Sequence, residues 1–368
     1  MAPLQGVRVL DLSRLLPGPM CTWYLASLGA EVVRVEAPSG HDYTRSMPPL
    51  VQGRSLFFAS VNRGKKSVAL DVRKPEGRDA FLMLCATADV VVEGFKPGTL
   101  ARQGLDPAGL VERFEKLIVA SITGYGQTGP LADEPGHDLN YLGLVGVTAA
   151  SLPDEHGVPP TPFPIADVAG GALTAALGIA AAVAGVARGG PGRWLDVSMT
   201  EGALAAFGPF LAMAQGEHRA HRPGQEMLTG GLGTYRAYRC ADGRILCVGA
   251  LEPKFWMRMR ELAPELPSVP ATHELVPVFA SRDRDDWVAL LTGCCVGPAL
   301  GATEVSDHPH HVARGAFQDY LGMPLANAPF GWSPSHEVPR VGEHTEELLR
   351  PLGVDLEALV ASGAGGLG

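Results

Sequence analysis

The chain is poor in charged and aromatic residues. Of its 368 residues, 19% are charged and 7% are aromatic, whereas 46% are hydrophobic. The formal net charge is -9 and the basic residues are scattered, so the sequence lacks the clustered basic surface that contact with nucleic-acid phosphates requires. This composition excludes a disordered chain and is typical of a globular protein.

Cysteine is also scarce, and its spacing fits neither a zinc site nor a disulfide framework. There are six cysteines without a C-x-x-C pair: Cys21, Cys85, Cys240, Cys247, Cys294 and Cys295. His308, His310 and His311 lie close together, but they lack the i, i+4 spacing of a helical metal site. We therefore expect no metal, no disulfide and a reducing compartment.

Targeting and membrane signals are absent as well. The N-terminal MAPLQGVRVLDLSR has no charged segment followed by an apolar one, and no peroxisomal signal ends the chain. The most apolar run, residues 171–187, consists mostly of Ala and Gly and is too short for a confident membrane span. The sequence favours a cytoplasmic protein in which this run is a buried helix.

The first half of the chain alternates strand and helix patterns. Apolar runs at 6–13, 31–38, 65–72, 89–95 and 117–126 predict strands, and helical segments lie between several of them. This alternation predicts an α/β fold with a parallel sheet. No G-x-G-x-x-G follows the first strand, which argues against a nicotinamide cofactor.

The pattern changes near residue 224. Before it, residues 167–187 and 200–214 predict helices; after it, a hairpin is expected with Asp242-Gly243 at its turn. Further helices are expected at 253–264, 284–293 and 343–352, and the glycine-rich tail 361–368 is expected to be mobile. Residue 224 is therefore the candidate domain boundary.

Three polar residues have both a structural and a chemical interpretation. Asp167 precedes the apolar helix and suits an N-cap, although Gly170 and Gly171 would let a ligand approach the first turn. Glu252 precedes Pro253 at another helix start. His137, in a Gly-His-Asp turn, could satisfy backbone groups only. Spacing alone favours the structural interpretation for each.

A series of motifs changes that balance. DLSRLLPGP, LGAEVVRVEAP, NRGKKSVALDV, EGFKPGTL, GYGQTGP, GHDLNY, DVAGG, ALEPKFW, VARGAF and GEHTEELL occur in this order across nearly the whole chain. The order resembles family III CoA-transferases (CaiB/BaiF), and GHDLNY and ALEPKFW resemble the 2-methylacyl-CoA racemase branch. The resemblance implies a catalytic His, Asp and Glu at His137, Asp167 and Glu252.

The resemblance also implies an architecture. It consists of a large Rossmann-like CoA-binding domain (1–223), a smaller α+β domain (224–322) and a C-terminal segment (323–368) that returns to the first domain. Such proteins form interlocked homodimers, so a second copy is the expected partner, together with an acyl-CoA substrate. No membrane, metal or redox cofactor is expected, because coenzyme A enters as part of the substrate.

The expected reaction is racemisation at the carbon next to a thioester. One group removes the α-proton and another returns a proton to the opposite face, through an enolate. We assign these roles to His137 and Asp167, with Glu252 orienting His137. Backbone N–H groups at the start of the 167–187 helix are expected to bind the enolate oxygen. The alternative is a CoA-transferase in which Asp167 attacks the thioester and forms a mixed anhydride.

The remaining candidates surround the substrate. Basic residues near the N-terminal strands are expected to hold CoA, with Arg34 favoured because guanidinium groups suit phosphates and also stack on adenine. The full set is Arg34, Lys65, Lys66, Lys96 and Arg102. Asn140 and Tyr141 are candidates for the pocket wall, and Asp138 is expected to cap a helix. One departure is Phe163, because racemases often carry an asparagine at this position, four residues before the aspartate.

Overall fold

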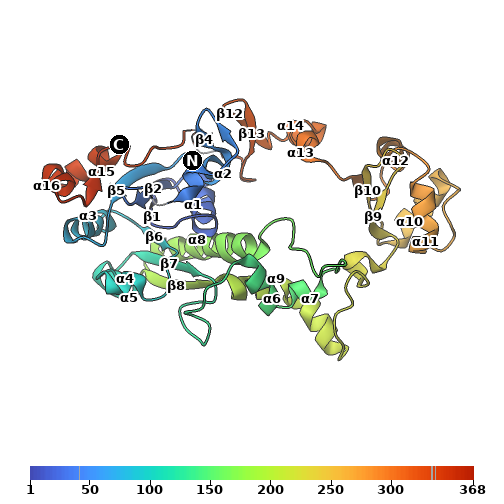
Figure 1. The fold of residues 1–368 in the computed structure, drawn as a ribbon, viewed down its shortest axis with the longest axis horizontal. Helices are drawn as coiled ribbons and strands as arrows, with labels where there is room; N and C mark the ends of the chain where they lie inside the picture. The colour runs from blue at the N-terminus through green and yellow to red at the C-terminus, as the bar shows by residue number, and fades with distance from the viewer. Residues whose placement is uncertain (41, 333–334, 336) are drawn as a thin grey trace. The chain divides into compact units, whose positions relative to one another are not determined.

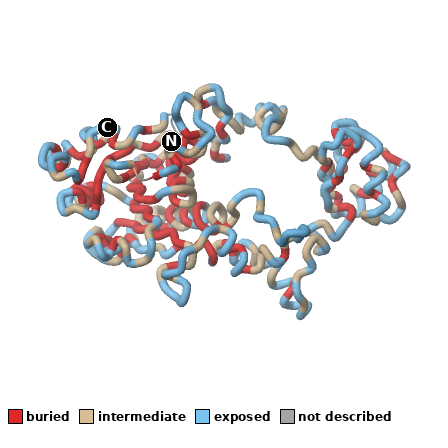
Figure 2. Tube along the Cα trace, in the orientation of Figure 1, coloured by how far each residue is buried: buried red, intermediate tan, exposed pale blue. Residues whose placement is uncertain are grey.

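The chain folds into two compact units. A computed structural model describes residues 1–40, 42–332, 335 and 337–368 (Figure 1). The first unit comprises Met1–Val145, Thr161–Pro209 and Gly315–Gly368, and the second comprises Gly146–Pro160 and Phe210–Arg314. Each unit has its own buried interior (Figure 2).

The first unit is built on one seven-stranded sheet. Its strands are β1 (Arg8–Asp11), β2 (Glu31–Glu36), β5 (Lys66–Leu70), β6 (Val90–Glu93), β7 (Ile118–Thr123), β8 (Arg193–Ser198) and β14 (Gly365–Gly366). The spatial order is β14-β5-β2-β1-β6-β7-β8, and every neighbouring pair is parallel except β14 with β5. The parallel sheet predicted from the alternating pattern is confirmed. The apolar strands β6 and β7 are buried along their whole length, as expected where helices cover both faces.

The strand order places a switch point at the centre of the sheet. The chain runs from β1 outward through β2 to β5, then returns to the other side of β1 and continues outward through β6, β7 and β8. Ligands of open α/β sheets bind beyond the carboxyl ends of the strands at such a point. The loops that follow β1 and β6 are therefore the first place to look for a site.

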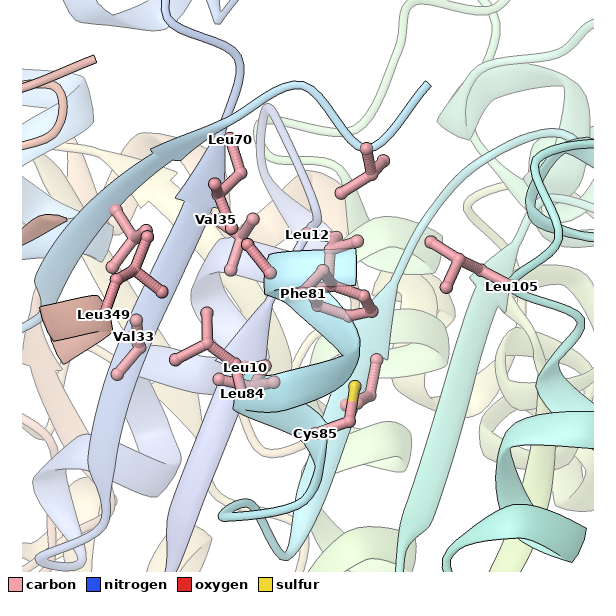
Figure 3. Close-up of a cluster of buried hydrophobic side chains, with 14 of the residues drawn as sticks. Leu10, Leu12, Val33, Val35, Leu70, Phe81, Leu84, Cys85, Leu105 and Leu349 are labelled. Atoms are coloured by element: carbon pink, nitrogen blue, oxygen red, sulfur yellow. The ribbon is translucent and has the colours of Figure 1, made fainter. Parts of the chain in front are cut away.

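Helices on both sides bury the sheet. They are α1 (Pro17–Ser27), α2 (Leu56–Asn62), α3 (Pro75–Cys85), α4 (Thr99–Arg102), α5 (Pro107–Arg113), α6 (Asp138–Leu144), α8 (Thr174–Ala187), α15 (Thr345–Leu349) and α16 (Leu356–Ala361). In one core cluster, Phe81 and Leu84 of α3 meet Leu10 and Val33 of the sheet and Leu349 of α15 (Figure 3). The last two helices thus complete a core that the N-terminal strands begin.

The expectation that the C-terminal tail is mobile is wrong. Gly365 and Gly366 form β14 and pair with Leu70 and Ala69 of β5. A Cβ atom on Gly365 would lie 2.6 Å from the Leu359 side chain. The missing side chain therefore lets the tail approach close enough to cover the edge of β5.

The second unit contains a small antiparallel sheet and several short helices. Its strands are β9 (Tyr235–Arg239), β10 (Ile245–Gly249) and β11 (Val296–Pro298), and its helices are α7 (Val147–Ala150), α10 (Pro253–Leu262), α11 (Thr272–Phe279), α12 (Arg284–Leu290), α13 (Ala302–Val305) and α14 (Pro309–Ala313). The predicted hairpin joins β9 to β10, with Gly243 at φ +78° in its turn. In the core of the second unit, the Phe279 ring packs against the rings of Tyr238 and Trp287.

The unit boundaries differ from the predicted 223/224 and 322/323. In the structure, the first boundary falls after Pro209 and not at residue 223. It therefore lies inside helix α9 (Met199–Gly216). The predicted second boundary cuts a hairpin formed by β12 (Phe317–Tyr320) and β13 (Met323–Ala326). This hairpin belongs to the first unit because Tyr320 and Leu325 pack against Ala59 of α2. Local composition does not report such packing between distant segments.

A buried ion pair lies under the loop that follows β1. The Lys65 ammonium lies 3.0 Å from the Asp11 carboxylate, and both side chains are fully buried. Lys65 also donates to the Pro19 carbonyl and to Asn62 Oδ1. Burial lowers the pKa of Lys65 to about 8, against the attraction of Asp11, which raises it. The pair therefore fixes the start of α1 relative to the sheet.

We expect Lys65→Met to lower the free energy of unfolding by about 3–5 kcal/mol, because it leaves a buried carboxylate without its counter-ion. The matched control is Lys66→Met. Lys66 pairs with Glu31 and Glu347 near the surface, where an ion pair contributes only about 0–1 kcal/mol. Urea denaturation followed by circular dichroism measures both. Equal losses in the two variants would contradict the structural role of Lys65.

Candidate active site

A pocket of about 550 Å³ lies at the predicted edge of the sheet. It is lined by residues 13–15 after β1, residues 94–97 after β6, residues 122–125 at the end of β7, and residues 132–137. Pro17, Gly18, Tyr141, Asp167 and Met199 complete its wall. The pocket therefore occupies the switch point between β1 and β6 and brings together two of the three predicted catalytic residues.

His137 is held by the turn that begins α6. Its backbone N–H donates to Asn140 Oδ1 at 3.0 Å. Tyr141, one turn along, donates its hydroxyl to the Gly136 carbonyl at 2.5 Å and packs edge-on against Tyr125. The Gly-His-Asp turn thus satisfies its own backbone groups, while the imidazole is exposed at the pocket.

Asp167 lies in a widened first segment of the long apolar helix. Residues Ala166–Leu173 form a π-helix, called η2 here, that continues directly into α8. Such segments are rare and frequent at functional sites. Burial is the main cause that raises the pKa of Asp167 to about 6; Asp138 raises it further and His137 lowers it. A carboxyl group with this pKa can give and take a proton near neutral pH.

The N–H groups at the start of η2 are already occupied. The Asp138 carboxylate accepts from Ala166 N at 2.6 Å and from Asp167 N at 3.1 Å, and Val168 N donates to the Pro164 carbonyl. These donors were expected to bind the enolate oxygen. The N–H groups of Ala166, Asp167 and Val168 therefore already have protein acceptors in this structure.

Gly170 and Gly171 serve helix packing and do not line the pocket. A Cβ atom on Gly170 would lie 2.2 Å from the Met199 carbonyl oxygen, and one on Gly171 would lie 2.9 Å from the Met199 side chain. Both glycines are buried. Asn140 also lies outside the pocket lining, whereas Tyr141 belongs to it. Of these four predicted pocket residues, the structure places only Tyr141 in the wall.

Glu252 lies in the second unit. It is exposed at the N-cap position of α10, before Pro253, and its side chain makes no capping hydrogen bond. The helix start predicted from Glu-Pro is therefore present. The orienting role that the sequence assigns to Glu252 stays a prediction.

Two of the predicted CoA-binding cations are buried. The Arg34 guanidinium bonds Asp42 at 2.5 Å and Asn62 at 3.1 Å and is inaccessible to solvent, and Lys65 pairs with Asp11. These contacts are those of structural ion pairs. Nothing in the local sequence indicates that Arg34 pairs with Asp42 or that Lys65 pairs with Asp11.

The three other cations are accessible. Lys66 pairs with Glu31 and Glu347 away from the pocket, and Arg102 donates to Thr99 Oγ1. Lys96 lines the pocket, 3.3 Å from Asp133. Of the five predicted residues, Lys96 is therefore the cation positioned to meet a ligand in this pocket.

The sequence analysis missed Arg14. It is exposed in the loop after β1, with its guanidinium carbon 5.7 Å from the centre of the Phe95 ring. Arg14, Ser13 and Phe95 line both the pocket and a smaller one of about 220 Å³ beyond the ends of β1, β2 and β5. Its position directly after the first strand is the signal that could have identified it.

The arrangement of possible metal-ligand side chains can be examined directly. Among the described residues, no three His, Cys, Asp or Glu side chains cluster closely enough to hold an ion. His308 caps α14, and His311 Nδ1 lies 2.7 Å from the Val305 carbonyl oxygen. Two of the three histidines singled out in the sequence thus contact the protein backbone.

Comparisons with known proteins show what the chain as a whole is similar to. The sequence profile of CoA-transferase family III matches residues 4–345. The chain is 36% identical to human alpha-methylacyl-CoA racemase, over 97% of this chain and 95% of that protein. It is 31% identical to mouse succinyl-CoA:glutarate CoA-transferase, over 95% and 86%. A crystal structure of a CaiB/BaiF family protein from Brucella suis superimposes with a TM-score of 0.83 at 28% identity, covering 95% of this chain and 99% of that one.

Proposed function

Because the chain belongs to CoA-transferase family III, we propose that it inverts the α-carbon of a 2-methylacyl-CoA thioester. The observation that carries this proposal is the presence of His137 and Asp167 in one pocket. Racemisation needs two proton-transfer groups, whereas CoA transfer needs one nucleophilic carboxylate. The pKa of Asp167, raised to about 6 mainly by burial, suits a group that alternates between base and acid.

The proposed reaction begins with removal of the C2 proton by one of the two residues. The C2–H bonding electrons move into the thioester, and the negative charge collects on its oxygen as an enolate. The other residue then donates a proton to the opposite face of C2. For the reverse reaction the two residues exchange roles, so the chemistry requires no electron transfer and no redox cofactor.

The enolate oxygen needs hydrogen-bond donors other than those of η2. The backbone N–H groups of Asp138 and Leu139 follow His137 directly. Within the described part of the chain, neither donates to a protein acceptor. We assign the enolate oxygen to these groups, since donors aimed at developing charge are commonly a large part of catalysis.

We propose that the CoA moiety occupies both pockets, which share the lining residues Ser13, Arg14 and Phe95. We place the acyl thioester in the pocket of His137 and Asp167 and the nucleotide end in the smaller pocket, so that the carrier passes Arg14. Arg14 and Lys96 are the accessible cations for its phosphates, and Arg34 supports the smaller pocket through its pair with Asp42.

The second candidate is a CoA-transferase. It is favoured by the accessible Asp167 carboxyl group and by the likeness to a succinyl-CoA:glutarate CoA-transferase. In that reaction Asp167 would attack the thioester carbonyl carbon and release CoA as a thiolate, leaving a mixed anhydride. His137 would then have no necessary role.

Hydrogen exchange at C2 separates the two reactions. The purified protein is incubated in D2O with either enantiomer of a 2-methylacyl-CoA and no acceptor acid. We expect deuterium to enter C2 while the configuration is lost, measured by mass spectrometry and chiral chromatography of the hydrolysed acid. CoA movement to an added carboxylic acid without C2 exchange would instead establish the transferase.

We also propose a homodimer, because a long apolar face of the first unit is uncovered. The segment Ala166–Ala187 is long and apolar enough, by length and composition, to cross a membrane, yet only 33% of its most apolar stretch is buried. Leu173 and Leu177 are exposed on it. A second copy of the chain would bury these side chains, and small-angle scattering of the purified protein distinguishes a dimer from a monomer.

A further inference from the structure

The carboxylate of Asp138 links the two proposed catalytic residues. It lies next to His137 in the sequence, and its Oδ1 accepts hydrogen bonds from the backbone N–H groups of Ala166 and Asp167, 28 and 29 residues away. We propose that Asp138 is a positioning residue that fixes the Asp167 carboxyl group relative to His137. This inference rests on the proposed function only in taking Asp167 as the reacting carboxylate.

The local sequence explains why this bond is needed. Helix starts leave backbone N–H groups unpaired, and a preceding Ser, Thr, Asp or Asn side chain usually accepts from them. Here Pro164 and Ile165 precede η2, and neither has a side chain that can accept. Asp138, from another helix, supplies the missing acceptor. The position of η2 therefore depends on the turn that carries His137.

The same contact answers the question raised by Phe163. An asparagine at this position would be available to support Asp167, but the Phe163 side chain is 53% exposed. Asp138, the first residue of α6, instead supports Asp167 by accepting a hydrogen bond from the backbone N–H group of Asp167. Asp167 therefore has a support in this chain that does not depend on the residue at position 163.

Asp138 also acts on Asp167 through charge. After burial, which is the largest cause, repulsion by the Asp138 carboxylate raises the pKa of Asp167, and His137 lowers it. The other titratable side chains of the pocket wall are Arg14, Lys96, Tyr125, Asp133, Glu134 and Tyr141. Of the other elements against η2, β7 and α8 carry no titratable side chain, and those on α1, β8 and α9 are Cys21, Tyr24, Arg193, Asp196 and Glu201.

Two substitutions separate the hydrogen bonds from the charge. Asp138→Asn keeps an oxygen that can accept from both N–H groups but removes the negative charge. Asp138→Ala removes both. The matched controls are Asp355→Asn and Asp355→Ala, because Asp355 likewise accepts a backbone N–H at a helix start, from Ala358 at 3.0 Å, and lines none of the pockets described above.

The protonation of Asp167 can be followed without substrate. Carboxyl-labelled aspartate is titrated by 13C NMR, with the Asp167→Asn variant identifying the signal. We expect a midpoint near pH 6 in the unaltered protein. Because the repulsion is gone, the midpoint is expected to move to lower pH in Asp138→Asn. Where Asp167 acts as the base it must be ionised, so the acid limb of kcat/KM for that enantiomer is expected to move to lower pH as well.

The turnover number distinguishes positioning from charge. Asp138→Ala is expected to lower kcat on the order of 100-fold with little change in KM, since a small displacement of a reacting group has a cost of that size. Asp138→Asn is expected to recover most of this loss, and the Asp355 variants to change neither kcat nor the titration.

The outcomes separate this inference from the proposed function. A shifted midpoint without any C2 exchange would support the role of Asp138 and overturn the racemase assignment. A kcat in folded Asp138→Ala equal to that of the unaltered protein would overturn the positioning role of Asp138, and an unchanged midpoint in Asp138→Asn would overturn only its effect through charge. If Asp138→Ala fails to fold, as shown by near-UV circular dichroism, Asp138→Ser takes its place: its shorter side chain is expected to weaken the two hydrogen bonds and lower kcat, and an unchanged kcat would overturn the positioning role.

Discussion

Replacing Asp167 by asparagine is expected to lower the rate of C2 hydrogen exchange on the order of 1,000-fold, because an amide cannot exchange a proton with carbon as a carboxyl group can. Asparagine has nearly the same shape, and the bonds from Asp138 reach the backbone of residue 167, so the fold should be kept. Exchange is measured by mass spectrometry in D2O from each enantiomer.

CoA binding provides the control for Asp167→Asn. Calorimetry with CoA should give nearly the same affinity as the unaltered protein, since Asp167 lies in the acyl part of the proposed site. Asp355→Asn, which changes a carboxylate at the distant start of α16, should leave exchange unchanged. Near-normal exchange in Asp167→Asn would refute both the racemase and the transferase assignments, because both require this carboxylate.

Replacing His137 by alanine is expected to lower the rate of interconversion of the enantiomers on the order of 1,000-fold. In a reaction with two bases, each residue serves one face of C2, so neither can complete the inversion alone. The measurement is chiral chromatography of the acyl group after timed incubation. Glu252→Gln should reduce the rate less, because that residue is proposed to orient His137 and not to carry the proton.

The His137 variant also distinguishes the two candidate functions. A transferase that uses Asp167 as its nucleophile should keep transferring CoA to an acceptor acid when His137 is removed. His156→Ala is a suitable control, because His156 is an exposed histidine outside the described pockets. Near-normal exchange from both enantiomers in His137→Ala would rule out the two-base reaction.

Much of the fold was predictable because its signals are local. Apolar runs separated by helical patterns predict a parallel sheet, and the structure confirms it. The tail was not predictable. Its glycines are typical of a flexible end. In the structure, however, the space between Leu359 and β5 is so narrow that it accepts a segment without side chains. The β12–β13 hairpin was missed because each of its strands is only four residues long, which is too short to give a clear alternating pattern.

The site was predictable in part. Resemblance of short motifs pointed to His137 and Asp167, and the structure places both in one pocket. Their catalytic roles, like that of Glu252, stay predictions. Arg34 and Lys65 look like phosphate-binding cations in the sequence, but they are buried against Asp42 and Asp11. A cation's sequence neighbours do not reveal which distant carboxylate pairs with it.

The sequence by itself determined the family, the α/β class and the segments that carry the proposed chemistry, because these depend on residue order and local periodicity. Only the tertiary structure decided which groups are free to act. In it, the first N–H groups of η2 already donate to Asp138. Arg34 and Lys65, which were expected to bind CoA, are buried in ion pairs. Arg14 is exposed and lines two pockets. Burial and hydrogen bonding join residues far apart in the chain. For this reason the contact from Asp138 to Asp167 has no counterpart in the sequence pattern.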